Sequence, residues 1–143
     1  MITRREDGYE VATDPDRLDI DLVHHWLSTD AFWALGRSRE TVEQSIRAST
    51  NFGLYDAGGA QVAYARVITD LATFAWLCDV YVAPTHRGKG LGTWLAAAVR
   101  DHLAPYQLKR TLLATLDAHE VYARVGFVTV PDPEHLMIMK PAH

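Results

Sequence analysis

The chain has 143 residues, of which 48% are hydrophobic and 22% are charged, a balance typical of one folded domain and unlike that of a disordered protein. Its formal net charge of −4 at pH 7 argues against a general nucleic-acid-binding protein, because neutralising phosphates requires a basic surface. The single cysteine, Cys78, excludes a disulfide within the chain, and its apolar surroundings indicate a buried, inert thiol. There is no apolar run of membrane-spanning length and no signal-peptide core at the N-terminus, so we expect a cytoplasmic protein without a membrane partner.

The first third of the chain predicts a short strand followed by two helices. Residues 8–13 alternate between polar and apolar side chains and are followed by an Asp-Pro pair, which indicates a strand that ends there. Apolar side chains recur at helical spacing over residues 18–27, with aspartates in the first turns, where the helix dipole favours them. After an irregular aromatic stretch at 28–39, a second short helix is expected from Thr41, where Thr-Val-Glu-Gln offers a capping box.

A meander of three strands is predicted next. Its strand-like segments are residues 51–55, 61–68 and 73–82, and the Gly-Gly pair between the first two indicates a hairpin loop. The third segment is rich in aromatic and β-branched residues and ends before Pro84. These segments predict the antiparallel part of a sheet.

The rest of the chain alternates between helices and strands. The pattern predicts an amphipathic helix at 91–103, a strand at 110–114, a helix at 118–125 closed by Gly126, and a final strand at 136–139. No repeat, low-complexity tract or linker interrupts the sequence, so we expect one domain over residues 1–143. The element order predicts an α/β or α+β sandwich with a mixed sheet.

The candidate chemistry is concentrated in the segment from Arg87 to Gly92, which reads Arg-Gly-Lys-Gly-Leu-Gly. It follows a predicted strand and precedes a predicted helix, a position in which successive backbone N–H groups and the helix dipole favour an anion. Its glycines allow close approach of the backbone, and Arg87 and Lys89 add positive charge. The segment therefore predicts a pyrophosphate site. A purely structural turn is the alternative, although such a turn needs one glycine rather than three.

Two common phosphate-binding motifs do not fit this segment. The NTPase phosphate loop requires Gly-x-x-x-x-Gly-Lys-Ser/Thr, a spacing absent here. The dinucleotide fingerprint Gly-x-Gly-x-x-Gly would need a glycine at position 93, which is Thr93. The pattern Arg/Gln-x-x-Gly-x-Gly/Ala remains, and Arg87, Gly90 and Gly92 match it.

Residues 80–92 resemble the coenzyme-A-binding motif of the GNAT N-acetyltransferase superfamily, and residues 121–127 resemble its later signature, a helical tyrosine followed by Gly-Phe. The resemblance extends over the whole chain in its element order. It implies a three-layer α/β (α+β) sandwich whose mixed, mostly antiparallel sheet is splayed between two parallel strands that hold coenzyme A. It also implies acetyl-CoA as the cosubstrate and no metal.

The resemblance assigns coenzyme contacts to the end of the preceding strand, to the loop and to one later position. These residues are Val80, Tyr81, Val82, Arg87, Gly88, Lys89, Gly90, Leu91, Gly92 and Thr115. The strand backbone would hold the pantetheine arm, and an N–H there would polarise the thioester carbonyl. Many family members carry Asn where this chain has Thr115, which puts the usual side-chain contact to the arm in doubt. Thr115 could instead cap the following helix.

The resemblance places Tyr122 where family members carry the tyrosine that protonates the departing thiolate, and packing in the core is the alternative. A phenol and a thiol have similar pKa values, so this proton transfer is feasible. Asp79, which interrupts an apolar strand, is the best candidate for a catalytic base; it could instead bind substrate or simply face outward. Asp70 and Glu120 are weaker candidates. His119 could help in proton transfer or be an ordinary surface histidine.

Aromatic and basic residues are candidates for binding the acceptor. They are Phe32, Trp33, Arg66 and Trp76. In the resembled family the region between the first two helices forms one wall of the acceptor pocket, and aromatic side chains there suit a small molecule with an apolar or cationic part. Ordinary packing explains them equally well. The seven histidines are scattered, so no metal site is predicted.

The leading functional hypothesis is an acetyl-CoA-dependent N-acetyltransferase whose acceptor is a primary amine, most simply a small molecule attacking the thioester directly. The alternatives are a non-catalytic acetyl-CoA sensor, which would have no use for Tyr122, and a protein or peptide N-acetyltransferase. No nucleic-acid partner is expected. Edge strands in this fold invite dimerisation, so a homodimer is among the expected states.

Overall fold

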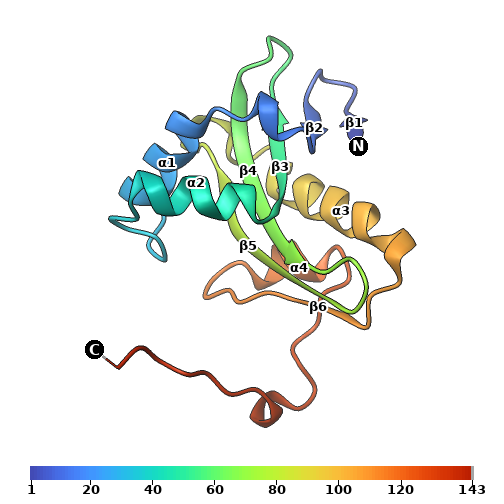
Figure 1. Cartoon of the computed structure of the whole chain (residues 1–143). Coiled ribbons are helices and arrows are strands. Elements are labelled where there is room, and N and C mark those ends of the chain that lie inside the picture. The colour runs from blue at the N-terminus through green and yellow to red at the C-terminus, as the bar shows by residue number, and fades with distance from the viewer. Residues whose placement is uncertain (143) are drawn as a thin grey trace.

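Six strands form one sheet in the structure, a computed structural model that describes residues 1–142 (Figure 1). Their order in the sheet follows the sequence: β1 (Ile2–Arg4), β2 (Glu10–Ala12), β3 (Thr50–Tyr55), β4 (Gln61–Thr69), β5 (Phe74–Val82) and β6 (Arg110–Leu112). All neighbours pair antiparallel except β5 and β6, which are parallel. The predicted mixed, mostly antiparallel sheet is therefore confirmed.

Helices cover both faces of this sheet and complete the three layers (Figure 1). They are α1 (Ile20–Thr29), α2 (Arg39–Arg47), α3 (Leu91–Leu103) and α4 (His119–Ala123). On one face, Trp26 and Val42 from α1 and α2 pack in a cluster with Tyr64 of the sheet. On the other face, Leu95 of α3 packs in a second cluster with Phe52. None of the helices in residues 1–142 is long and apolar enough to cross a membrane.

Side-chain caps set the start of the first two helices. The Asp19 carboxylate accepts a hydrogen bond from the Leu22 amide and begins α1. At α2 the Ser38 hydroxyl accepts from the Thr41 amide, so the helix begins at Arg39. The predicted capping box at Thr41 is wrong, because the serine three residues earlier satisfies the exposed amide.

A β-bulge in β5 opens the sheet next to its parallel pair. Tyr64 of β4 pairs with Tyr81, but Arg66 pairs with Cys78, so β5 carries one extra residue between these positions. Within this bulge Asp79 has a positive φ of 52°. Such a bulge bends the strand and re-aims its side chains.

The two parallel strands diverge just before the bulge. β5 and β6 pair at residues 74–76 of β5, and within residues 1–142 the remaining part of β5, residues 77–82, has no strand partner on that side. This is the splayed arrangement that the family resemblance implied.

The ends of the chain differ most from the prediction. The N-terminal strand β1 was not predicted; it pairs with β2, and the Arg4 guanidinium donates to the Glu10 carboxylate at 2.7 Å. Both β6 and α4 are shorter than predicted, ending at Leu112 and Ala123.

The predicted final strand over Leu136–Met139 is wrong. These residues are extended but pair with no strand among residues 1–142, and their side chains are exposed, Met137 by 97% and Met139 by 94%. Pro131 and Pro133 lack backbone N–H groups, and a short 3-10 turn at Pro133–His135 leads the chain away from the sheet (Figure 1). Residues that do not reach a sheet edge form no ladder.

Candidate active site

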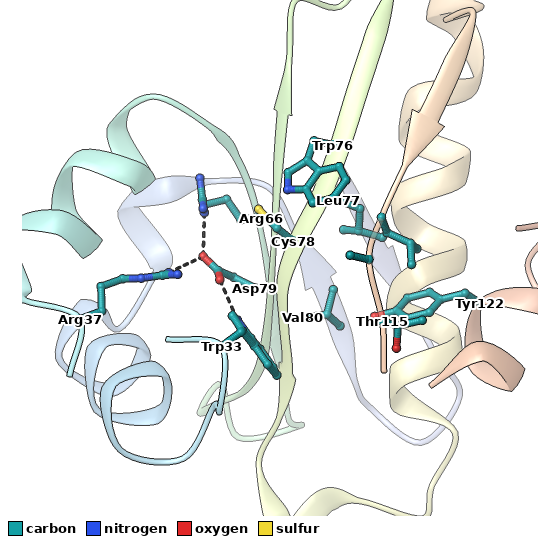
Figure 2. Close-up of a pocket in the computed structure, with 12 residues that line it drawn as sticks. Trp33, Arg37, Arg66, Trp76, Leu77, Cys78, Asp79, Val80, Thr115 and Tyr122 are labelled. Atoms are coloured by element: carbon teal, nitrogen blue, oxygen red, sulfur yellow. Dashed lines mark hydrogen bonds and ion pairs between the residues drawn. The ribbon is translucent and has the colours of Figure 1, made fainter. Parts of the chain in front are cut away.

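A cavity of about 310 Å³ lies where β5 and β6 diverge, and Tyr122 of α4 also lines it (Figure 2). Trp33, Arg66 and Trp76, three of the predicted substrate-binding residues, line this cavity. Phe32 does not; it packs edge-on against the Trp33 ring and is 56% exposed.

A second groove, of about 430 Å³, runs along β5 and the glycine-rich loop to α4. Its lining includes Val82, Arg87, Gly88 and Gly90, all predicted to bind the coenzyme. Val80 and Tyr122 line both the groove and the cavity. The two spaces therefore meet at one strand position and one phenol, as a two-substrate transfer requires.

The backbone of the loop is arranged to receive an anion. Gly88 and Gly90 have positive φ values of 81° and 74°, and a Cβ added at either would meet no atom within 4 Å. Gly90 caps α3 without any side-chain hydrogen bond. Within residues 1–142, the amide N–H groups of residues 88–93 reach no protein acceptor with good hydrogen-bond geometry. The loop thus offers open donors at the positive end of a 13-residue helix.

Both cationic side chains of the loop contact other parts of the protein. Arg87 donates through Nε to the Val82 carbonyl at 2.9 Å and lies over the Tyr81 ring. The Lys89 ammonium donates to the Tyr9 hydroxyl at 3.4 Å, and Arg5 donates to the Lys89 carbonyl at 3.2 Å. These contacts brace the loop from the start of the sheet.

Sequence reasoning missed Arg5 and Tyr9, because they contact Lys89 of the loop across 84 and 80 residues of sequence, respectively. Tyr9 also hydrogen-bonds with the His86 ring at 2.9 Å, which fixes the turn before the loop. No local pattern in the first ten residues signals this role.

Two of the predicted residues sit beside α4. Burial, followed by the charge of Asp117, raises the pKa of Tyr122, so its phenol stays protonated at neutral pH. The Thr115 hydroxyl accepts a hydrogen bond from the Ala118 amide at 3.0 Å, which holds the turn before α4. It is not the helix cap considered for it, because the N-cap of α4 is Ala118 and no side chain caps that helix within residues 1–142.

Asp79 is the most heavily bonded side chain of the cavity (Figure 2). Its Oδ1 accepts from Trp33 Nε1 at 2.9 Å, and its Oδ2 accepts from Arg37 Nη1 at 2.8 Å and Arg66 Nε at 2.9 Å. The residue is only 4% exposed, so it does not face outward. Burial alone would raise the pKa of Asp79, but the hydrogen bond from Arg37 and the charge of Arg66 outweigh it and the pKa is lowered.

Arg37 is a third residue that sequence reasoning did not select. It lies on the segment between α1 and α2, and 42 residues separate it from Asp79. The signal available was indirect: a carboxylate in an apolar strand requires cationic partners, and the neighbouring aromatic segment contains them. Arg66 has a further partner, because its Nη1 donates to the Ser49 hydroxyl at 3.0 Å.

Comparison with known proteins identifies the family to which this geometry belongs. Residues 20–127 match the family model described as Acetyltransferase (GNAT) family. The chain belongs to the GNAT family. A Gibberella zeae protein named "Putative acetyltransferase FG08082" is 32% identical over 135 residues, which cover 81% of this chain and 76% of that protein.

Solved structures of GNAT proteins share the fold. The crystal structure of a Xanthomonas campestris protein, described as a putative acetyltransferase of the GNAT family, has a TM-score of 0.88 and 43% identity, covering 97% of this chain and 96% of that one. N-acetylglutamate synthase from Neisseria gonorrhoeae, solved with coenzyme A and N-acetyl-glutamate, has a TM-score of 0.71 and 21% identity over 91% of this chain and 30% of that one. The latter likeness concerns the fold alone.

The only thiol of this GNAT chain lines the cavity but is not activated. Burial raises the pKa of Cys78 to about 11, with the charge of Arg66 opposing that rise. The group is therefore a neutral thiol at neutral pH, whereas nucleophilic cysteines have a lowered pKa.

Proposed function

We propose that this GNAT protein is an acetyl-CoA-dependent N-acetyltransferase that acetylates a primary amine of a small molecule by direct attack on the thioester. One observation carries the proposal: the coenzyme groove and the acceptor cavity meet at Val80 and Tyr122. A cavity of about 310 Å³ matches a small acceptor better than a folded protein surface.

The loop and the open strand fit a coenzyme A molecule. The free amides of residues 88–93 would hold its pyrophosphate, and the unpaired edge of β5 at 77–82 would hold its pantetheine arm as an added strand. When bound, acetyl-CoA supplies the activated acetyl group. That the gonococcal synthase of the same fold was solved with coenzyme A supports this assignment.

Tyr122 is the proposed general acid. It lines both spaces, and its raised pKa keeps the proton available for the departing thiolate at neutral pH. Cys78 takes no part, because direct attack by the amine needs no covalent enzyme intermediate.

For Asp79, the geometry favours a positioning role over the base considered from the sequence. A carboxylate with a lowered pKa whose two oxygens already accept three hydrogen bonds is a weak proton acceptor. We assign to it the placement of Arg37 and Arg66 in the cavity wall.

We infer that two copies of the chain associate. A groove of about 540 Å³ separates residues 111–115 from residues 127–130, beside the free edge of β6. The exposed apolar tail at 136–139 pairs with no strand among residues 1–142, so the tail of a second copy would fit the groove. Light scattering during size-exclusion chromatography tests this: a dimer supports it, and a monomer at all concentrations contradicts it.

The catalytic proposal is tested by measuring thiol release from acetyl-CoA across a panel of amines, with the acetylated product identified by mass spectrometry. Acetyl transfer to at least one small amine, abolished when the amine is omitted, is the expected result. Thiol release that is independent of every amine, without an acetylated product, would contradict the proposed function.

A further inference from the structure

The acceptor cavity has a charge of its own. Among the described residues that line it, the charged side chains are Arg37, Arg66 and Asp79. Two guanidinium groups against one carboxylate leave a net positive charge in a protein whose formal net charge is −4. A positive cavity in a negatively charged protein favours a ligand with an anionic group.

The single negative charge is hidden from a ligand. The side chain of Asp79 is 2% exposed, and its oxygens accept from Trp33 and both arginines. An acceptor ammonium would therefore find no free carboxylate oxygen there. The side chains of Arg37 and Arg66 are 20% and 12% exposed, so the charge that the wall presents is positive.

Both guanidinium groups retain donors beyond those that Asp79 uses. Arg37 engages Asp79 through Nη1, and Arg66 engages Asp79 and Ser49 through Nε and Nη1, whereas Nη2 of each reaches no acceptor within residues 1–142. Neither Nη2 atom is among the fully buried polar atoms that lack a partner, so both remain open to solvent. The hydrogen bonds to Asp79 hold both arginine side chains in place, which lowers the conformational entropy that they lose on binding a ligand.

We propose that Arg37 and Arg66 bind a carboxylate on the acceptor, so that the substrate class is amines that also carry a carboxylate, such as amino acids. A carboxylate carries the single negative charge that balances the net charge of the cavity, whereas a phosphate monoester carries close to two. The inference rests on the proposed function, because it presumes that this cavity holds the acceptor.

The position of the arginines matches this role. Figure 2 shows the Asp79 group on the side of β5 that faces the first helices, and Tyr122 on the side that faces α3 and α4. All of them line one cavity. An acceptor anchored by its carboxylate at the arginines would extend its amine toward Val80 and Tyr122, and the rings of Trp33 and Trp76 would contact its body.

The test compares amines that differ only in the anionic group. Phenylalanine with phenethylamine, and tryptophan with tryptamine, are matched pairs with and without the carboxylate; phosphoethanolamine with ethanolamine forms the phosphate arm. We expect kcat/KM for the carboxylated member to be higher by about 10- to 100-fold, the range expected for one charge-assisted contact. Equal or better use of the decarboxylated amines, or a preference for the phosphorylated one, would overturn the inference.

Variants connect the preference to the two arginines. Arg37→Met and Arg66→Met should each reduce the carboxylate preference by about tenfold or more through KM, while Arg37→Lys should keep part of it. Arg39→Met, which removes two exposed ion pairs outside the cavity, is the matched control and should leave the carboxylate preference unchanged. If one Met variant does not fold, the other and the Lys variant still decide the question.

Binding without turnover separates this inference from the proposed function. Trp33 and Trp76 line the cavity, so their fluorescence reports an added ligand. We expect amino acids to change the emission with coenzyme A present, and the matched amines and the Met variants to show about tenfold weaker binding. Such binding without any acetyl transfer would refute the proposed function and keep the carboxylate site. Acetylation of amines without this selectivity would refute the carboxylate site and keep the proposed function.

Discussion

Three donors converge on the Asp79 carboxylate, and the geometry of the acceptor cavity depends on them. Replacing this residue by asparagine would leave two partly buried guanidinium groups against a neutral amide. Removing one member of a buried ionic network costs about 3–5 kcal/mol. We therefore expect Asp79→Asn to lower the free energy of unfolding by this amount in urea titrations, and an unchanged stability would contradict the network.

The same residue predicts a pH dependence. Because the folded-state pKa of Asp79 lies below its ordinary value of 3.8, its stabilising effect is present at higher pH and is lost as pH falls through the folded pKa. The difference in Tm between the wild type and Asp79→Asn should be constant near neutral pH and shrink below about pH 4. A difference that grew on acidification would show that the pKa is raised instead.

At Tyr122 the expected effect is on the rate. Tyr122→Phe should reduce kcat by about 10²- to 10⁴-fold, the usual contribution of a general acid, while the Kd for coenzyme A stays within about twofold. Tyr106→Phe, at an exposed tyrosine outside both spaces, is the control. An unchanged kcat in Tyr122→Phe would assign the phenol to packing against Phe127.

Among the elements, the loop before α3 depends on contacts from the start of the sheet. Tyr9→Phe removes the hydroxyl that contacts both Lys89 and His86, so the Kd for coenzyme A should rise by about three- to tenfold. Tyr55→Phe, in strand β3, is a useful counterpart because its buried hydroxyl has no hydrogen-bond partner among residues 1–142. That variant should bind coenzyme A normally and be as stable as the wild type or more stable, by up to about 1 kcal/mol.

Local patterns predicted most of the helices and strands but few of the contacts between them. The meander, α3 and the anion-binding loop follow from alternation, helical spacing and glycine placement, which neighbouring residues determine. The bulge at Asp79, the partnership with Arg37 and the bracing by Tyr9 depend on residues 13 to 80 positions away, which no local pattern encodes. The tail shows the converse: residues 136–139 form an apolar run that predicts a strand, but within residues 1–142 they pair with no sheet edge.

At the scale of the whole molecule, charge is distributed unevenly. An acidic chain presents a positive acceptor cavity and a loop with open amides, two sites that both suit anions. Salt screens exposed charges more than buried ones, so rising ionic strength should weaken binding at the exposed loop more than at the partly buried arginines. Measuring both Kd values between low and physiological salt tests this order, and a steeper loss at the arginines would contradict it.

The most direct test of the account is a calorimetric titration of coenzyme A into the wild type, Gly92→Leu and Ala97→Leu. Gly92 is helical, and its missing Cβ would make ordinary 3.9 Å contacts with Val82 and Val121, so a leucine extends into the groove without backbone strain. Ala97 lies on the same helix outside the groove. The account predicts binding to the wild type and Ala97→Leu, with at least about tenfold loss in Gly92→Leu. Failure of folded wild type to bind coenzyme A, or equal affinity in all three proteins, would contradict the coenzyme site and the acetyl transfer built on it.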